Sequence, residues 1–130
     1  MEEFQMQLIE DGRILRVELS GVFNSRVVEA MDAEIVRHLE ESPVRLVLLF
    51  NASGIQKVSP DILTHGKVRF MHHAKAHPVK FVWGASMLAK TMSNLFTKVI
   101  GHELSRFFNT EEEALAAVRK YSAEVDPAAR

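Results

Sequence analysis

One run of residues, Leu46 to Phe50, limits what this chain can fold into more than any other segment. The run reads Leu-Val-Leu-Leu-Phe, so every side chain in it is apolar and none alternates with a polar neighbour. A strand with one face in water alternates, whereas a strand covered on both faces does not. The run therefore predicts a central strand with helices packed on both sides, which is the arrangement of an α/β sandwich.

The residues before this run indicate a β-hairpin and then a helix. Apolar and polar residues alternate in 4–8 and again in 15–19, and Asp11-Gly12 between them suits the positive φ angles of a tight turn. We expect these two strands to pair antiparallel. Apolar residues then recur at helical spacing after a cap at Asn24 or Ser25; they are Val28, Met31, Ile35 and Leu39.

The chain after the apolar run continues to alternate helix and strand. Helical spacing predicts a helix from Asp61 to about Ala76, and the apolar segment 79–83 predicts a buried strand. A helix over 86–100 and a short strand over 106–108 follow. Each predicted helix thus connects two predicted strands, as parallel pairing requires.

The last helix has the clearest start, because Thr110 and Glu113 form a capping box. The expected fold class is α/β, with element order ββαβαβαβα, an N-terminal hairpin and a mixed, mainly parallel sheet with helices. We expect a single domain at 1–122 and a flexible C-terminal tail at 123–130.

Composition narrows the function. The 130 residues are 47% hydrophobic and 25% charged with a formal net charge of -1, so there is no net cationic field to attract nucleic acid. The absence of cysteine excludes a disulfide framework and thiolate catalysis. The N-terminus does not read as a signal peptide, and no run approaches the roughly 18 apolar residues of a membrane helix. We expect a cytoplasmic protein that neither inserts into a membrane nor binds nucleic acid.

Reactive groups do not converge in any recognisable motif, so we predict that the protein is not an enzyme and needs no cofactor. The best metal candidate is the pair His73 and His77, spaced to bind one ion from a helix face. Pro78 opposes this, because the residue before proline is pushed out of helical geometry. We expect solvated histidines near a helix C-terminus; the alternative, metal-assisted hydrolysis, predicts bound zinc or nickel.

The densest group of basic residues allows two interpretations. A solvated helix face is one, and a surface for nucleic acid or acidic headgroups is the other. We favour the solvated face, because no recognition module accompanies the group. Its members are Lys67, Arg69, Lys75 and Lys80.

Residues 50–63 carry a resemblance to a known family. The sequence Phe-Asn-Ala-Ser-Gly-Ile-Gln-Lys-Val-Ser-Pro-Asp-Ile-Leu resembles the signature of STAS domains, the sulfate-transporter and anti-sigma-factor-antagonist family. Further matches lie in 19–23 and 107–115, so the resemblance covers nearly the whole chain and implies a STAS-like sandwich. The alignment places Ser53-Gly54 at the family's turn, Val58 at an apolar position, Ser59 at an aspartate, Pro60 at a serine and Asp61 at the phosphorylatable serine.

The start of the second predicted helix has two interpretations. In the first, the three residues only stabilise the helix start: Ser59 caps it, Pro60 suits its first position, and Asp61 places a negative charge at the positive end of the helix dipole. The cap contributes about 1 kcal/mol. The resemblance implies instead a docking surface for a protein partner, in which Asp61 acts as a permanent phosphate-like charge or control moves to Ser59. In both versions the residues that contact the partner are Ser53, Gly54, Ser59, Pro60, Asp61, Leu63, Met92 and Phe96.

The resemblance further implies a bacterial regulator without catalytic activity, in the manner of an anti-sigma factor antagonist, with an anti-sigma kinase-like ATPase as partner. The third predicted helix allows other occupants, because apolar residues cover more than one stripe of it. A wide core contact, a homodimer or a lipid tail would each explain the excess. The alternative function is therefore a carrier of an apolar small ligand or lipid, with a pocket between the second and third helices.

Overall fold

The chain begins with the predicted hairpin. The computed structural model describes residues 4–61, 69–70, 73–84 and 105–125. Strand β1 (Phe4–Ile9) pairs antiparallel with β2 (Ile14–Phe23). The turn between them holds Glu10, Asp11 and Gly12 at φ angles of 52°, 58° and 77°, and such left-handed angles match the right-handed twist of the two strands.

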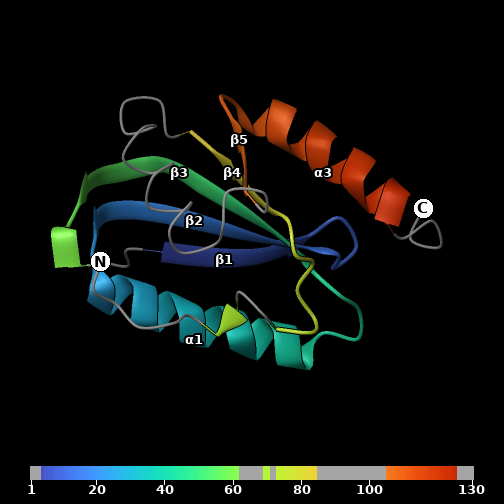
Figure 1. The fold of residues 1–130 in the computed structure, drawn as a ribbon, viewed down its shortest axis with the longest axis horizontal. Helices are drawn as coiled ribbons and strands as arrows, with labels where there is room; N and C mark the ends of the chain where they lie inside the picture. Colours follow the sequence, from blue (N-terminus) through green and yellow to red (C-terminus); the bar gives the residue numbers. More distant parts are fainter. Residues whose placement is uncertain (1–3, 62–68, 71–72, 85–104, 126–130) are drawn as a thin grey trace.

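The hairpin is joined to three further strands in one sheet of order β1-β2-β3-β4-β5 (Figure 1). The added strands are β3 (Val47–Val58), β4 (Lys80–Trp83) and β5 (Ser105–Phe108). Each of them pairs parallel with its neighbour, and β3 pairs parallel with β2. The predicted mixed, mainly parallel sheet is therefore confirmed.

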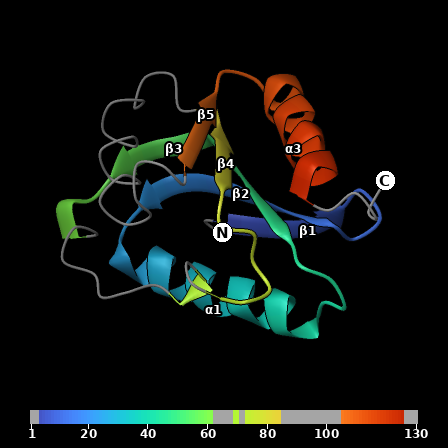
Figure 2. The same ribbon diagram turned by 45° about the vertical axis from the view of Figure 1, so that its right-hand side comes forward.

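The two described helices cover opposite faces of the sheet (Figures 1 and 2). Helix α1 (Ser25–Glu41) packs on one face and α3 (Glu111–Val125) on the other. Strand β3 contributes to both cores: Leu48 and Phe50 belong to the cluster beneath α1, and Val47 and Leu49 to the cluster beneath α3. The apolar run is therefore part of a strand that is buried on both faces, because a helix packs on each face, as the sequence predicted.

Both helix starts have the predicted caps. The Val27 amide donates to Asn24 Oδ1 over 3.0 Å at the start of α1. The Glu113 amide donates to Thr110 Oγ1 over 3.2 Å at the start of α3. Helix α3 continues past Ser122 to Val125.

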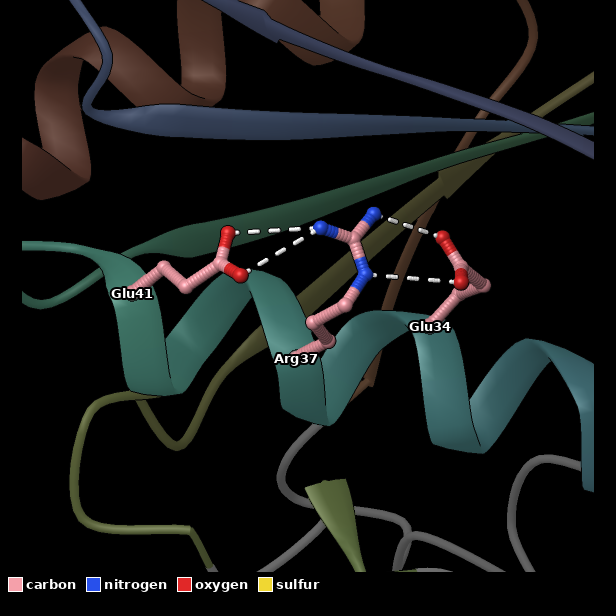
Figure 3. A network of polar contacts seen from close by, with 3 residues as sticks. All are labelled: Glu34, Arg37 and Glu41. Atoms are coloured by element: carbon pink, nitrogen blue, oxygen red, sulfur yellow. Dashed lines mark hydrogen bonds and ion pairs between the residues drawn. The ribbon is translucent and has the colours of Figure 1, made fainter.

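The solvent face of α1 carries a chain of three charged residues (Figure 3). Arg37 Nη2 donates to Glu34 Oε2 over 2.8 Å, and Arg37 Nη1 donates to Glu41 Oε2 over 3.3 Å. The hydrogen bond from Arg37 lowers the pKa of Glu34, and the same contact raises the pKa of Arg37. These are exposed helix pairs of the kind that contributes little to stability.

The course of β3 after Phe50 corrects one prediction. The strand continues to Val58, so Ser53-Gly54 lies inside it and forms no turn. Strand β2 passes unusually close here: a Cβ on Gly54 would lie 2.7 Å from the Leu19 carbonyl oxygen. The register between the two strands shifts at this point. Glycine permits the close approach, and this use of glycine resembles a turn signal in sequence.

The helix predicted over 61–76 is wrong at its end. Ala74 and Lys75 form a turn, and Ala76 bridges to Leu46 as an isolated parallel pair. Asp32 of α1 binds the preceding residues, because its carboxylate accepts from the amides of Arg69 (3.0 Å) and Phe70 (2.9 Å). The central part of that helix and the whole of the helix predicted over 86–100 lie outside the described residues.

Candidate functional site

The predicted docking residues that are described lie in the second half of β3 and directly after it, toward the carboxyl ends of the parallel strands, where α/β sheets commonly place their sites. Four of them are exposed, and Ser59 is half-buried. The structure separates them into two groups, since Ser53 and Ser59 are roughly 20 Å apart along an extended strand. We call Ser59, Pro60 and Asp61, together with Ser25, the Asp61 corner. The other predicted contacts, Leu63, Met92 and Phe96, lie outside the described residues.

Asp61 is held against the start of α1. Its Oδ1 accepts from the Ser25 amide over 3.1 Å, and its Oδ2 accepts from the Ser25 hydroxyl over 3.0 Å. The Ser25 amide belongs to the first turn of α1, where backbone N–H groups have no partner inside the helix. The sequence predicted that Asp61 would act on the helix that it precedes, whereas the structure shows it bound to α1. Ser25 is the residue that the site analysis of the sequence missed, because it lies 36 positions away.

Ser59 and Pro60 mark the end of β3. The Ser59 amide donates to the Phe23 carbonyl oxygen over 2.8 Å, which extends the contact between β2 and β3 by one residue. Pro60 and Asp61 then enter a 3₁₀ turn. The strand ends therefore bring Asp61 to the first residue of α1, and the exposed carboxylate has a defined position.

Ser53 forms the second group, together with Asn51 and Gly84. The Ser53 amide and hydroxyl both donate to Asn51 Oδ1, over 2.9 Å and 2.6 Å. Gly84, at a φ of 82°, follows β4 and lies so close that a Cβ on it would be 2.7 Å from the Ser53 Cβ. Sequence analysis missed Gly84, although a glycine directly after an apolar strand is a signal of close backbone approach.

The two histidines of the predicted metal pair make different contacts. His77 is buried and its ring meets the Tyr121 ring edge-on at 5.7 Å, so the prediction of a solvated side chain is wrong for it. His73 Nδ1 accepts from the Lys75 amide over 3.0 Å. Within the described part of the chain, no group of three or more His, Cys, Asp or Glu side chains is arranged to hold a metal ion.

The predicted basic helix face is wrong for Lys80. This side chain is fully buried at the start of β4, and its Nζ donates to the carbonyl oxygens of His77 (3.1 Å) and Pro78 (3.0 Å). Burial lowers the pKa of Lys80 to about 8. The other described members are also engaged: Lys75 Nζ donates to the Ser42 carbonyl oxygen over 2.9 Å, and Arg69 lies 3.7 Å from the Asp32 carboxylate. Lys67 lies outside the described residues.

Two cavities are lined by described residues, and neither lining includes a residue of the Asp61 corner. One of about 230 Å³ lies between the hairpin turn and the end of α3 and includes Glu10, Arg13 and Arg119. Another of about 210 Å³ lies over β1 and β2 and includes Gln7 and Arg16. The apolar pocket predicted between the second and third helices concerns segments outside the described residues, so the carrier function stays a prediction.

Membrane insertion through a helix finds no support in the part of the chain that is described. Each helix there is too short or insufficiently apolar to span a bilayer.

Comparison with known proteins gives a result in structure and none in sequence. No family model matches the chain, and no curated protein matches it. The structure of the anti-sigma factor antagonist SpoIIAA in its unphosphorylated form matches with a TM-score of 0.61 at 15% identity, over 90% of this chain and 96% of that one. An uncharacterized protein of the DUF3478 family with a SpoIIAA-like fold, from Shewanella loihica PV-4, matches with a TM-score of 0.58 at 17% identity, over 88% and 90% of the two chains. The chain therefore has a SpoIIAA-like α/β fold, and the predicted fold class is confirmed.

Proposed function

We propose that this protein is a non-catalytic regulatory module that docks a protein partner through the Asp61 corner. The observation that carries the proposal is the Asp61 carboxylate, which is exposed and yet held in place by two hydrogen bonds from Ser25. A charge that is already positioned loses little conformational entropy when a partner binds it. Such a charge favours recognition of a cationic group on another protein.

The charge has a counterpart in the STAS resemblance. Asp61 aligns with the serine that the family phosphorylates, and a phosphoserine carries about -1.5 to -2 charge at pH 7. Asp61 then acts as a constant, phosphate-like charge, or the control by phosphate has moved to Ser59. Ser59 is half-buried, and its amide is hydrogen-bonded to Phe23. A phosphate on Ser59 would therefore add negative charge near the Asp61 carboxylate and change the affinity of the corner for a partner.

The partner that fits this function is an ATP-using kinase of the anti-sigma type. SpoIIAA, which shares the fold, is described as an anti-sigma factor antagonist with an unphosphorylated form. By this analogy the protein acts in the bacterial cytoplasm, in signal transduction that controls transcription. The analogy rests on fold, and the Asp61 corner is the feature of this chain that makes it testable.

Calorimetric titration of the purified protein with the anti-sigma-type ATPase of its own host tests the proposal. Asp61→Asn removes the charge and keeps the side-chain shape, and we expect it to change the dissociation constant at least about tenfold. Asp61→Ser, which restores the residue type of the family, should change it as well. Glu41→Gln is the matched control, because it removes an exposed carboxylate at the other end of α1. Equal binding by the wild type and all three variants would contradict the proposal that the partner recognises the charge of Asp61.

Mass spectrometry of protein from the native host separates the two versions. A stoichiometric phosphate on Ser59 supports control by phosphorylation, and an unmodified chain that binds in an Asp61-dependent way supports the permanent charge. Stoichiometric phosphate at another residue would contradict both.

A further inference from the structure

Strand β1 is the outer strand at one edge of the described sheet, and its own sequence carries none of the usual protection of such an edge. It pairs with β2 along its whole length without a register shift, so the backbone groups on its other side point away from the sheet. Edge strands of monomeric proteins are usually short, bulged, or guarded by charge or proline. The six residues of β1, Phe-Gln-Met-Gln-Leu-Ile, contain neither charge nor proline. Among the described strands, only β2 pairs with β1, so the outer side of β1 can accept another strand.

The opposite edge of the sheet is guarded by contrast. Strand β5 has only 4 residues and carries the exposed charge of Arg106. The charged residue that follows β1 is Glu10, and Arg119 of α3 binds its carboxylate, with Nε 2.8 Å from Oε1. The difference between the two edges singles out β1.

The two faces of β1 differ in character. Phe4 and Met6 pack toward the core beneath α1, and Leu8 follows them on the same face, where 44% of its surface is exposed. Gln5 and Gln7 lie on the other face, exposed, beside the cavity that includes Arg16. A strand added at this edge would have to place an apolar side chain beside Leu8 and polar ones beside the glutamines.

We propose that β1 pairs antiparallel with the β1 strand of a second copy of this chain, about a two-fold axis at Met6. This register sets Met6 opposite Met6, Phe4 opposite Leu8 and Gln5 opposite Gln7. A two-fold axis perpendicular to the sheet keeps each side chain on its own face. The apolar faces of the two copies therefore lie on the same side of the joined sheet. Phe4 then covers the exposed part of Leu8, and the glutamine amides can bond to one another. One continuous sheet runs through both copies.

The interface is small, because one strand pair buries less than the roughly 800 Å² per partner of a standard interface. We therefore expect a dissociation constant on the order of micromolar. Sedimentation equilibrium of the wild-type chain between about 1 and 200 µM covers this range. A wild type that stays monomeric at every concentration would overturn the proposal, and it is the result expected if β1 serves a strand of a different protein.

Two exposed apolar residues give a matched pair of variants. Leu8→Lys adds a charge to the β1 edge and should raise the dissociation constant at least about tenfold, because the charge would lie against Phe4 of the second copy. Phe107→Lys makes the same kind of change at a residue that is 39% exposed and lies on β5, the opposite edge strand of the sheet, and it should leave the dimer unchanged. Equal weakening by both variants, with circular dichroism showing that both fold, would overturn the proposal.

The register has its own test. Gln5→Lys combined with Gln7→Glu sets opposite charges against each other across the proposed axis, and it also places them favourably against Glu18 and Arg16 of β2. This double variant should dimerise at least as tightly as the wild type, with an affinity that falls as salt is added. A dimer without salt dependence would contradict the proposed pairing of Gln5 with Gln7.

Discussion

Two aspartates make the same kind of contact, a carboxylate that accepts two hydrogen bonds from a distant segment, but one is buried and the other is exposed. Asp32 accepts hydrogen bonds from the amides of Arg69 and Phe70 and is only 7% exposed. Asp61 accepts two hydrogen bonds from Ser25 and is exposed. Water can replace the second carboxylate and cannot reach most of the first. The buried aspartate therefore holds two segments of the fold together, whereas the exposed one lies at the surface of the protein.

The largest effect is expected for Asp32→Ala. The amides of Arg69 and Phe70 lose their acceptor in a place shielded from water, which should lower the free energy of unfolding by roughly 3 kcal/mol. Urea unfolding at pH 7 measures this loss. Asp32→Asn, which keeps one acceptor oxygen, should lose less. If Asp32→Ala costs no more than Asp61→Ala, burial does not separate the two residues as we describe.

Lys80 extends the comparison to a buried positive charge. Burial lowers its pKa to about 8 in the folded chain, whereas an unfolded lysine has a pKa of about 10.4. Between these values the unfolded chain binds more protons, so this residue makes stability rise with pH. The full gain is about 3 kcal/mol, from about 1.4 kcal/mol for each pH unit.

Denaturant titrations at a series of pH values between about 7 and 10.5 test this expectation. Lys80→Met should remove the rise, because methionine does not titrate. The readout is the difference in slope between variant and wild type, because this difference removes the contribution of every group that the two chains share. A variant that keeps the full slope would show that Lys80 does not cause it.

The smallest effect is expected at the exposed corner. Asp61→Ala should lower the free energy of unfolding by only about 0.5 to 1 kcal/mol, the usual range for an exposed cap, because Asn24 still caps α1. Glu41→Ala, at the solvent-exposed chain of Figure 3, should leave the unfolding midpoint unchanged. A loss at Asp61 as large as that at Asp32 would mean that the corner is mainly structural.

Local patterns predicted those elements that depend on neighbouring residues. The hairpin, the strand at 79–83 and the capping box at Thr110 each follow from residues within a few positions of one another. The apolar run at 46–50 was informative because a strand without alternation is buried on both of its faces. Turn chemistry and hydrophobic period act over this range, and the structure confirms them.

The predictions failed where distant segments meet. Gly54 reads as a turn until β2 is placed beside it, and Lys80 and His77 read as surface residues until β4 is placed in the sheet. The errors at Lys80 and His77 assigned water to residues that the fold buries, and the error at Gly54 missed its close contact with β2. Burial depends on which segments come together, and no single stretch of sequence contains that information.

The sequence by itself determined the opening hairpin, the first and last helices, the central buried strand and the acidic residue at position 61. Only the tertiary structure decided that the Asp61 carboxylate lies on Ser25 at the start of α1, and that Asp32 is shielded from water. The reason is physical. Hydrophobic period and capping act between residues a few positions apart, whereas the role of a charge depends on the groups and the water around it after the chain has folded.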